Sequence, residues 1–244
     1  MKIESCKEFN KFIIQDIRYK ILYSKFMAKI TWAGQSCFQI SVSSSKDNQT
    51  NIVIDPFSDI GLKIPNFEAD ILIVTHQHSD HSNTKAVKGN YFLIDGPGEY
   101  EVKGVFVQGI NSFHDNKEGK ERGKNTMYII ETEDIRFCHL GDLGQQQLTD
   151  EQLEKIGAVD VLMIPVGGVY TIDSHEATKI IGQIEPKIVI PMHYELPKLK
   201  ITLDGVEKFL KVMGKNTIEP QDKLTVKSSL LPKDKEMEIV VLEP

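Results

Sequence analysis

Short apolar runs separated by polar turns fill most of the chain, and this pattern predicts strands rather than long helices. The clearest runs are 30–32, 37–42, 52–55, 71–74 and 91–95, followed by 126–132, 135–140, 161–166 and 187–191. Residues 102–113 alternate as one strand or a pair, and weaker strand signals lie at 223–226 and 238–242. Residues 43–51 and 116–125 are polar and predict loops.

Helical patterns follow these strands, mostly in the second half of the chain. A helix is predicted from Thr149 to Ile156, where Thr149 and Gln152 have the spacing of a capping box. Further helices are predicted over 174–184, capped by Asp173 or Ser174, and over 203–213. Two rounds of strands followed by helices predict two sheets packed face to face, with helices outside.

The domain organisation predicted from this pattern is simple. Residues 27–244 contain no linker or repeat and are expected to form one domain. Residues 1–26 alternate charged and apolar side chains without Gly or Pro. They are either a helical extension packed on the domain or a mis-called extension before a natural start at Met27.

Composition excludes several classes of protein. The formal net charge of −6 and the pI of about 5.7 make nucleic acid an unlikely partner. Three cysteines, Cys6, Cys37 and Cys138, provide no disulfide framework and fit a reducing compartment. No apolar run approaches the ~20 residues of a membrane span, and the N-terminus lacks a signal-peptide pattern. We therefore expect a cytoplasmic protein without a membrane partner.

One stretch carries most of the candidate chemistry. Directly after the apolar run 71–74 come four potential metal ligands within six residues: His76, His78, Asp80 and His81. Imidazoles and a carboxylate suit a borderline-soft dication such as zinc. With Asp80 between His78 and His81, this turn can offer ligands to two ions.

The motif His76-x-His78-x-Asp80-His81 resembles the signature of the metallo-β-lactamase-fold superfamily. Asp55 after a strand, a lone middle histidine, Gly141-Asp142 and the late His193 follow in that superfamily's order, over roughly 27–195. The sequence is most similar to small zinc-dependent hydrolases of the lactonase-like branch. The resemblance implies an α/β fold, a four-layered αββα sandwich of two mixed sheets with outer helices.

The resemblance also implies a dinuclear metal site. His76, His78 and the middle histidine would bind one ion, Asp80, His81 and His193 the other, and Asp142 would bridge them. Two zinc ions, or iron or manganese, would share a hydroxide that attacks an ester, lactone, thioester or phosphodiester. Asp80 or Asp142 would steer that hydroxide as catalytic residues.

The middle histidine is either His114, which ends a strand, or His139, which lies inside one. Ligands of this fold cluster at strand ends, so we favour His114. Asp55 is expected to orient the ligand loop rather than bind metal. Gln35 and Gln145 stand where related hydrolases often carry histidine, which puts proton delivery to a leaving group in question.

Several further residues are candidates for the pocket and its substrate. Asn125 and Tyr170 could line it, although packing roles are the simpler interpretation. Lys117, Lys120, Arg122 and Lys124 near His114 form either a solvated loop or a site for an anionic small-molecule substrate. The alternative function is a di-iron redox protein or a non-hydrolytic metal-binding protein of the same fold.

Overall fold

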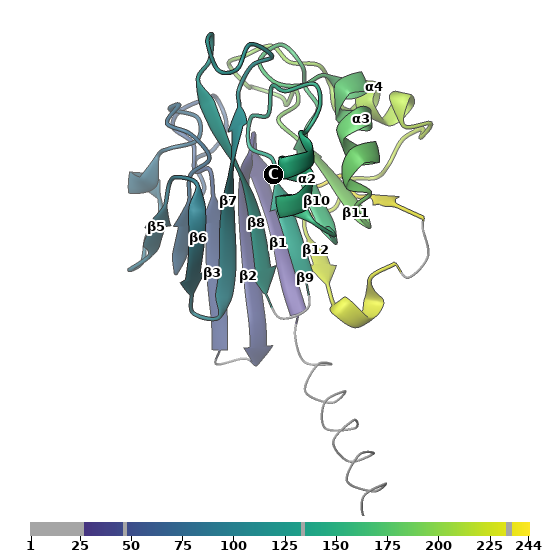
Figure 1. Cartoon of the computed structure of the whole chain (residues 1–244). Coiled ribbons are helices and arrows are strands. Elements are labelled where there is room, and N and C mark those ends of the chain that lie inside the picture. The colour runs from purple at the N-terminus through teal and green to yellow at the C-terminus, as the bar shows by residue number, and fades with distance from the viewer. Residues whose placement is uncertain (1–26, 46–47, 133–134, 233–235) are drawn as a thin grey trace, which may run out of the picture.

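The structure, a computed structural model, describes residues 27–45, 48–132, 135–232 and 236–244. The predicted extension 1–26 lies outside the described residues. Two mixed β-sheets face one another, with α-helices outside (Figure 1). Within the described residues the helices are α2 (Asp150–Ile156), α3 (Ser174–Ile184) and α4 (Val206–Val212). This arrangement confirms the predicted fold class.

The first sheet is antiparallel at one edge and parallel at the other. Its order is β12 (Leu224–Val226), β1 (Met27–Gly34), β2 (Cys37–Ser45), β3 (Asn48–Ile54), β4 (Ile71–Ile73) and β5 (Phe92–Ile94). The pairs from β12 to β3 are antiparallel, whereas β3, β4 and β5 run parallel. The carboxyl ends of these three strands therefore lie at one edge of the sheet.

The second sheet has the same mixed construction. Its order is β13 (Glu238–Ile239), β11 (Ile188–Met192), β10 (Val161–Pro165), β9 (Ile135–His139), β8 (Lys124–Thr132), β7 (Val105–Phe113) and β6 (Gly98–Val102). The strands from β13 to β9 are parallel, and those from β9 to β6 are antiparallel. Because two antiparallel steps separate β7 from β9, both strands end at the same edge of the sheet.

The main core lies between the two sheets. Alternate residues of β1, Ala28, Ile30 and Trp32, are buried, as the period of a strand requires. On the other face of the first sheet, Val53 and Leu72 belong to a smaller apolar cluster. Strands β10 and β11 are buried at every position, because the helices cover the outer face of the second sheet.

Most predicted elements are present, and the differences have simple causes. The loop expected at 43–51 is too long, because antiparallel pairing continues beyond the apolar core to Ser45 and resumes at Asn48. Strand β6 was missed because it is an exposed edge strand without an apolar run. A short 3-10 turn, η1 (Thr84–Ala86), lies between β4 and β5. A second such turn, η2 (Ser228–Leu230), follows β12.

The capping predictions are confirmed. Thr149 and Gln152 form a capping box at α2, and Asp173 caps α3 with Glu176 as its partner. Among the described residues, no helix is long and apolar enough to cross a membrane.

Candidate metal centre

The predicted ligands converge because they follow strands that end on one side of the two sheets. His76 comes after β4, His114 after β7, Asp142 after β9 and His193 after β11. The turn between β1 and β2 meets the end of β3, since Phe38 pairs with Ile54. It therefore brings Gln35 and Ser36 to the same place.

Seven side chains form two groups of potential ligands. In each group the ligand atoms lie within 4.8 Å of one another. The first group is His76, His78 and His114, and the second is Asp80, His81, Asp142 and His193. The structure thus brings together every residue of the expected ligand set; that they bind metal stays a prediction.

In the first group, two imidazoles turn their nitrogens toward one another. His76 Nε2 lies 3.0 Å from His78 Nδ1. The other nitrogen of His76, Nδ1, lies 3.0 Å from Thr75 Oγ1. Since the Thr75 hydroxyl donates its proton to Asp55 Oδ2 (2.7 Å), it must accept from His76 Nδ1. That tautomer leaves the Nε2 lone pair free for a cation.

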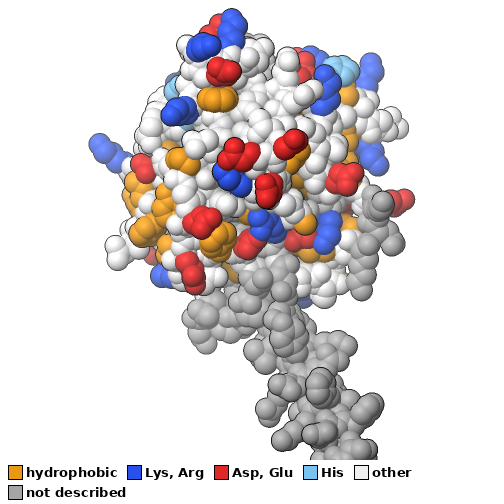
Figure 2. Space-filling view, viewed as in Figure 1, with side chains coloured by type: hydrophobic (Ala, Val, Ile, Leu, Met, Phe, Trp, Pro, Cys, Tyr) orange, Lys and Arg blue, Asp and Glu red, His pale blue; other side chains and the backbone are white. Residues whose placement is uncertain are grey.

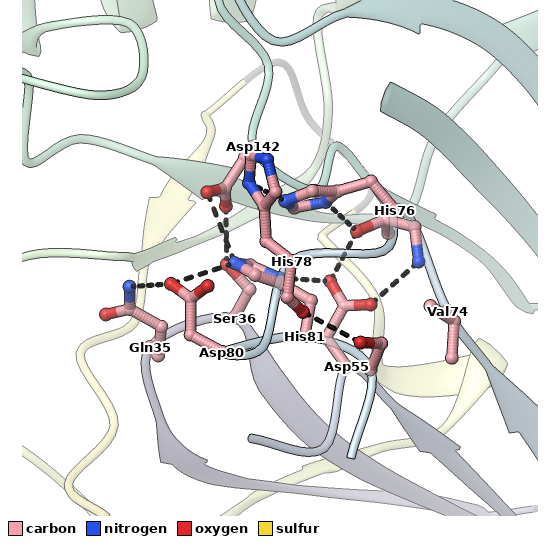
Figure 3. A network of polar contacts seen from close by, with 12 residues as sticks. Gln35, Ser36, Asp55, Val74, His76, His78, Asp80, His81 and Asp142 are labelled. Carbon is pink, nitrogen blue, oxygen red and sulfur yellow. Dashed lines mark hydrogen bonds and ion pairs between the residues drawn. The ribbon is translucent and has the colours of Figure 1, made fainter. Parts of the chain in front are cut away.

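Asp142 lies between the two groups. Its Oδ2 is 3.3 Å from His114 Nε2 of the first group, and 3.2 Å from both His81 Nε2 and His193 Nε2 of the second. Its Oδ1 accepts a hydrogen bond from Ser36 Oγ (3.1 Å) (Figure 3). One carboxylate oxygen therefore faces histidines of both groups, which is the placement a bridging ligand needs.

Asp55 orients the second group without belonging to it. This fully buried carboxylate accepts from the Thr75 backbone N–H (2.8 Å) and lies 2.9 Å from His81 Nδ1. The contact fixes the His81 ring so that Nε2 points into the cluster. A carboxylate behind a ligating imidazole commonly has this role.

Gln35 also contacts the second group. Its Nε2 lies 2.8 Å from His193 Nε2. It also lies 3.2 Å from Asp80 Oδ2 (Figure 3). Its backbone carbonyl accepts from the His193 N–H (3.0 Å), so the β1–β2 turn supports the His193 loop. Gln145 is different: its Oε1 accepts from the Phe113 N–H (2.9 Å), and its Nε2 donates to Gln152 (3.1 Å). It links β7 to α2.

The backbone is left-handed at three positions of the site. Gln35, Asp55 and His193 have φ values of 53°, 49° and 50°. Such conformations are uncommon for residues other than glycine and concentrate at functional sites, where the surrounding structure enforces them. Here each follows or joins a strand and turns its side chain toward the cluster.

Two glycines allow the ligand loops to pack closely. A Cβ atom at Gly144 would overlap the backbone of His114, and one at Gly167 would overlap the carbonyl of His193. Neither Gly144 nor Gly167 could therefore carry a side chain without moving a candidate ligand. The sequence shows these glycines but not what they contact.

Burial and mutual charge set the protonation of the cluster. Burial opposes protonation of His76 and, with the positive charge of His81, lowers the pKa of His76 to about 3. Burial acts the same way on His81, but the charges of Asp142 and Asp55 outweigh it and raise the pKa of His81 well above its ordinary value. Burial opposes ionisation of Asp142, but His193 and His81 together lower its pKa well below the usual range.

His139 is engaged elsewhere. Its Nε2 lies 3.0 Å from the carbonyl oxygen of Ser36, and its Nδ1 accepts from the Gly141 N–H (3.1 Å). Both ring nitrogens are used, and both contacts support residues next to Asp142. His114, in contrast, turns its Nε2 into the cluster, so the geometry favours His114 as the middle ligand.

Other predicted residues separate into two kinds. Tyr170 lines a hollow of about 410 Å³ beside the cluster, together with His78, Asp80, His114, Asp142 and His193. Asn125 is buried beneath it, where its Oδ1 accepts from the Asp142 N–H (3.1 Å). Sequence reasoning missed the support given by Ser36 and Thr75, whose only signal is their place beside Gln35 and His76.

The donor set fits a pair of metal ions. His81 Nε2 is buried and has no hydrogen-bond partner among the described residues, although it points into a cluster of carboxylate and imidazole groups. An unpaired buried nitrogen is costly unless a ligand satisfies it. The described cysteines, Cys37 and Cys138, are buried outside both groups. Nitrogen and oxygen donors alone suit zinc, iron or manganese.

Comparison with known proteins gives a consistent picture. The model of a family described as the beta-lactamase superfamily domain matches residues 29–193. A protein named as a metal-dependent hydrolase from Thermococcus onnurineus (strain NA1) is 29% identical over 196 residues, which are 69% of this chain and 85% of that protein.

Solved structures share the fold. A proposed Zn-dependent hydrolase of the metallo-β-lactamase superfamily from Thermotoga maritima is 38% identical, with a TM-score of 0.69, over 89% of this chain and 100% of the other. A diiron beta-hydroxylase from Streptomyces venezuelae is 13% identical, with a TM-score of 0.53, over 84% of this chain and 54% of its own. That second likeness shows the fold alone.

Proposed function

The chain belongs to the beta-lactamase superfamily domain family, and from that membership we propose that it is a metal-dependent hydrolase with two metal ions in the cluster. The observation that carries the proposal is the position of Asp142 Oδ2, between His114 of one group and His81 and His193 of the other. The names of the relatives from Thermococcus onnurineus and Thermotoga maritima support a hydrolase.

The residues have distinct roles in this proposal. His76, His78 and His114 would hold one zinc ion, Asp80, His81 and His193 the other, and Asp142 both. When bound, such a pair lowers the pKa of a shared water and polarises the bond to be hydrolysed. Asp55, Ser36 and Thr75 would keep the ligands oriented through the contacts described above.

Asp80 is the better candidate to steer the attacking water. Its side chain is 25% exposed and lines the 410 Å³ hollow, whereas that of Asp142 is 3% exposed and both its oxygens are engaged. Burial opposes ionisation of Asp80, but the positive charge of His81, whose Nε2 lies 3.5 Å from Asp80 Oδ2, lowers the pKa of Asp80 well below the usual value. Asp80 is therefore ionised near neutral pH and can orient the attacking water as a negatively charged hydrogen-bond acceptor, whereas the amide of Gln35 carries no charge.

The substrate proposed is a small molecule with an anionic group and an ester, lactone, thioester or phosphodiester bond. Arg122 lines the hollow beside the cluster. On the face shown in Figure 2, basic and acidic side chains are interspersed, which supports a small molecule rather than nucleic acid. The two described cysteines are free, which supports a reducing compartment such as the cytoplasm.

A second candidate is an iron protein of the same fold with a redox or non-hydrolytic role. The absence of a thiol from both candidate groups favours it as much as zinc, because imidazole and carboxylate ligands suit iron. In that case the purified protein would contain iron and consume oxygen with a reductant, without hydrolysing any of the four bond types.

The test is an assay of protein purified without chelator against four chromogenic substrates: an ester, a lactone, a thioester and a phosphodiester. We expect at least one to be hydrolysed, the activity to disappear after dialysis against a chelator, and zinc to restore it. Hydrolysis that survives complete metal removal, or no hydrolysis in any metal form, would overturn the proposal.

A further inference from the structure

Two hollows lie beside the candidate metal centre and share part of their lining. The first, of about 410 Å³, contains Asp80, Asp142 and His193 in its lining. The second, of about 440 Å³, is lined by His76 and His78 but not by Asp142 or His193. Of the described residues, His78 and Arg122 line both hollows. Arg122 therefore stands where a substrate in the first hollow would extend into the second.

The Arg122 side chain is held in a defined position. Its guanidinium carbon lies 5.4 Å from the centre of the Tyr170 ring, and its Nη2 donates to the carbonyl of Val169 at 3.4 Å. Stacking on an aromatic ring orients the planar guanidinium and leaves its other N–H groups free. An arginine held in this way is ready to bind a carboxylate or a phosphate through two parallel hydrogen bonds.

The loop that carries Arg122 is fixed by a single carboxylate. Asp115 accepts backbone hydrogen bonds from Lys117, Gly119, Glu121 and Arg122 at 2.8–3.0 Å. Burial opposes ionisation of Asp115, but these four donors outweigh it and lower its pKa to about 2. Asp115 follows His114 directly, so the loop and the candidate metal ligand share one anchor.

The cations of this loop divide into paired and unpaired ones. Lys117 forms an ion pair with Glu121 (2.6 Å) and Lys120 with Glu118 (3.6 Å). Arg122 and Lys124 form no ion pair with any residue that the structure describes. Arg122 and Lys124 are also the two cations that line the second hollow.

Acidic groups reduce but do not cancel this positive charge. Asp95, which is exposed, lines the second hollow, and Glu121 lines the first, where Lys117 already pairs with it. The lining of the second hollow therefore contains two cationic side chains and one carboxylate. The side chains of Gln77, Asn111 and Thr126, also in its lining, add hydrogen-bonding groups.

We propose that the second hollow is a subsite for an anionic group of the substrate, a carboxylate or phosphate that is not itself hydrolysed, with Arg122 as the specificity-determining residue. The inference rests on the proposed function and names its substrate class: a compound with a hydrolysable bond at the cluster and a negative charge beyond His78. Lys124 adds charge to the subsite, and Asp115 positions Arg122.

Binding tests the subsite without hydrolysis. Isothermal titration of the protein purified without chelator would compare butyrate, which has one carboxylate, with succinate, which has a second. We expect succinate to bind about 10- to 100-fold more tightly, the range for hydrogen bonds to charged groups. In Arg122→Ala the ratio should fall to about one, and in Arg122→Lys it should be intermediate.

Lys120→Ala is the matched control, since it removes one positive charge from the same loop but lines neither hollow. It should leave the butyrate-to-succinate ratio unchanged. 3-Phosphonopropionate, in which a phosphonate replaces one carboxylate of succinate, shows whether the subsite prefers a phosphate or a carboxylate. Tighter binding than succinate indicates a phosphate group, and weaker binding indicates a carboxylate.

Hydrolysis separates this inference from the proposed function. The wild type should hydrolyse p-nitrophenyl hemisuccinate with a higher kcat/KM than p-nitrophenyl acetate. Arg122→Ala should hydrolyse the two esters with equal kcat/KM and keep its activity on the acetate. Equal binding of butyrate and succinate by the wild type, or a ratio that survives Arg122→Ala, overturns the subsite. If the ratio of succinate to butyrate affinity falls to about one in Arg122→Ala but the wild type hydrolyses neither ester, the subsite is supported and the proposed hydrolase function is contradicted.

Discussion

The two groups of candidate ligands differ in how firmly the protein holds them. In the second group His81, Asp142 and His193 are buried, and Asp80 is partly exposed. Asp55 supports His81, Ser36 supports Asp142, and Gln35 contacts Asp80 and His193. In the first group His78 is exposed, and His76 contacts the hydroxyl of Thr75.

The groups also differ in charge. The second contains two carboxylates, Asp80 and Asp142, whereas the first has three imidazoles and only shares Asp142. Carboxylates offset the charge of a dication and imidazoles do not. Preorganisation and charge therefore both predict that the second group binds its ion more tightly. The first group, in which His78 is exposed, contributes to the lining of both hollows, whereas the second group lines only one of them.

The largest expected effect comes from the residue that joins the groups. Asp142→Asn keeps the shape of the side chain but removes the charge that faces three histidines. We expect kcat/KM for the best substrate to fall by about 10³-fold, since metal ions supply several kcal/mol and each 1.4 kcal/mol is about tenfold. Steady-state kinetics would measure this.

Asp160→Asn is a suitable control for that substitution, because Asp160 pairs with Lys187 far from the cluster. A fall in kcat/KM of less than tenfold for Asp142→Asn would show that the two groups do not depend on a shared carboxylate.

The next effect concerns the middle histidine. His114→Ala should lose the ion of the first group and keep that of the second, because it removes one of three imidazoles. His139→Ala should keep both ions and instead lower thermal stability, since the contacts of His139 are to Ser36 and Gly141. Metal analysis and thermal unfolding of both variants would check this; full occupancy in His114→Ala would refute the assignment.

A smaller effect is expected from the support of His81. Asp55→Asn should weaken metal binding at the second group by about 10- to 100-fold, the usual cost of changing a residue behind a ligating histidine. The same change at Asp70, which pairs with Lys103 at the surface, should leave affinity unchanged. Competition titration with a chromophoric chelator would give both affinities. Equal losses of metal affinity in Asp55→Asn and Asp70→Asn would show that Asp55 has no particular role in holding His81.

The smallest effect compares the two groups within the wild type. Zinc release to a chelator should occur in two phases. The ion of the first group should leave about tenfold faster than that of the second, which corresponds to a difference of ~1.4 kcal/mol in the activation free energy of release. Because His114→Ala lacks the first group's ion, it should show only the slow phase. A single phase containing both ions would mean that the groups hold metal equally.

The fold could be predicted from the sequence to the extent that side-chain pattern determines it. Buried strands such as β4 and β10 are apolar throughout, and Thr149 and Gln152 mark the start of α2. Strand β6 has no such pattern, because an exposed edge strand is held by backbone hydrogen bonds that any residue can make.

The site was predictable where its residues follow strands and not where its support comes from distant segments. His76, His78, Asp80 and His81 are contiguous, so their closeness follows from the sequence alone. The contacts of Ser36 with Asp142 and of Asp55 with His81 span 106 and 26 residues. Likewise, only the structure separates Arg122, which lines both hollows, from Lys117 and Lys120, which are paired.

The most direct test of the central claim is the metal content of protein purified without chelator, measured by elemental mass spectrometry alongside His78→Ala. If each of the two groups binds one ion and they share Asp142, the wild type should contain about two zinc ions per chain. His78→Ala, which alters only the first group, should contain about one. No bound metal in the wild type, even after reconstitution with zinc, iron or manganese, would contradict the account.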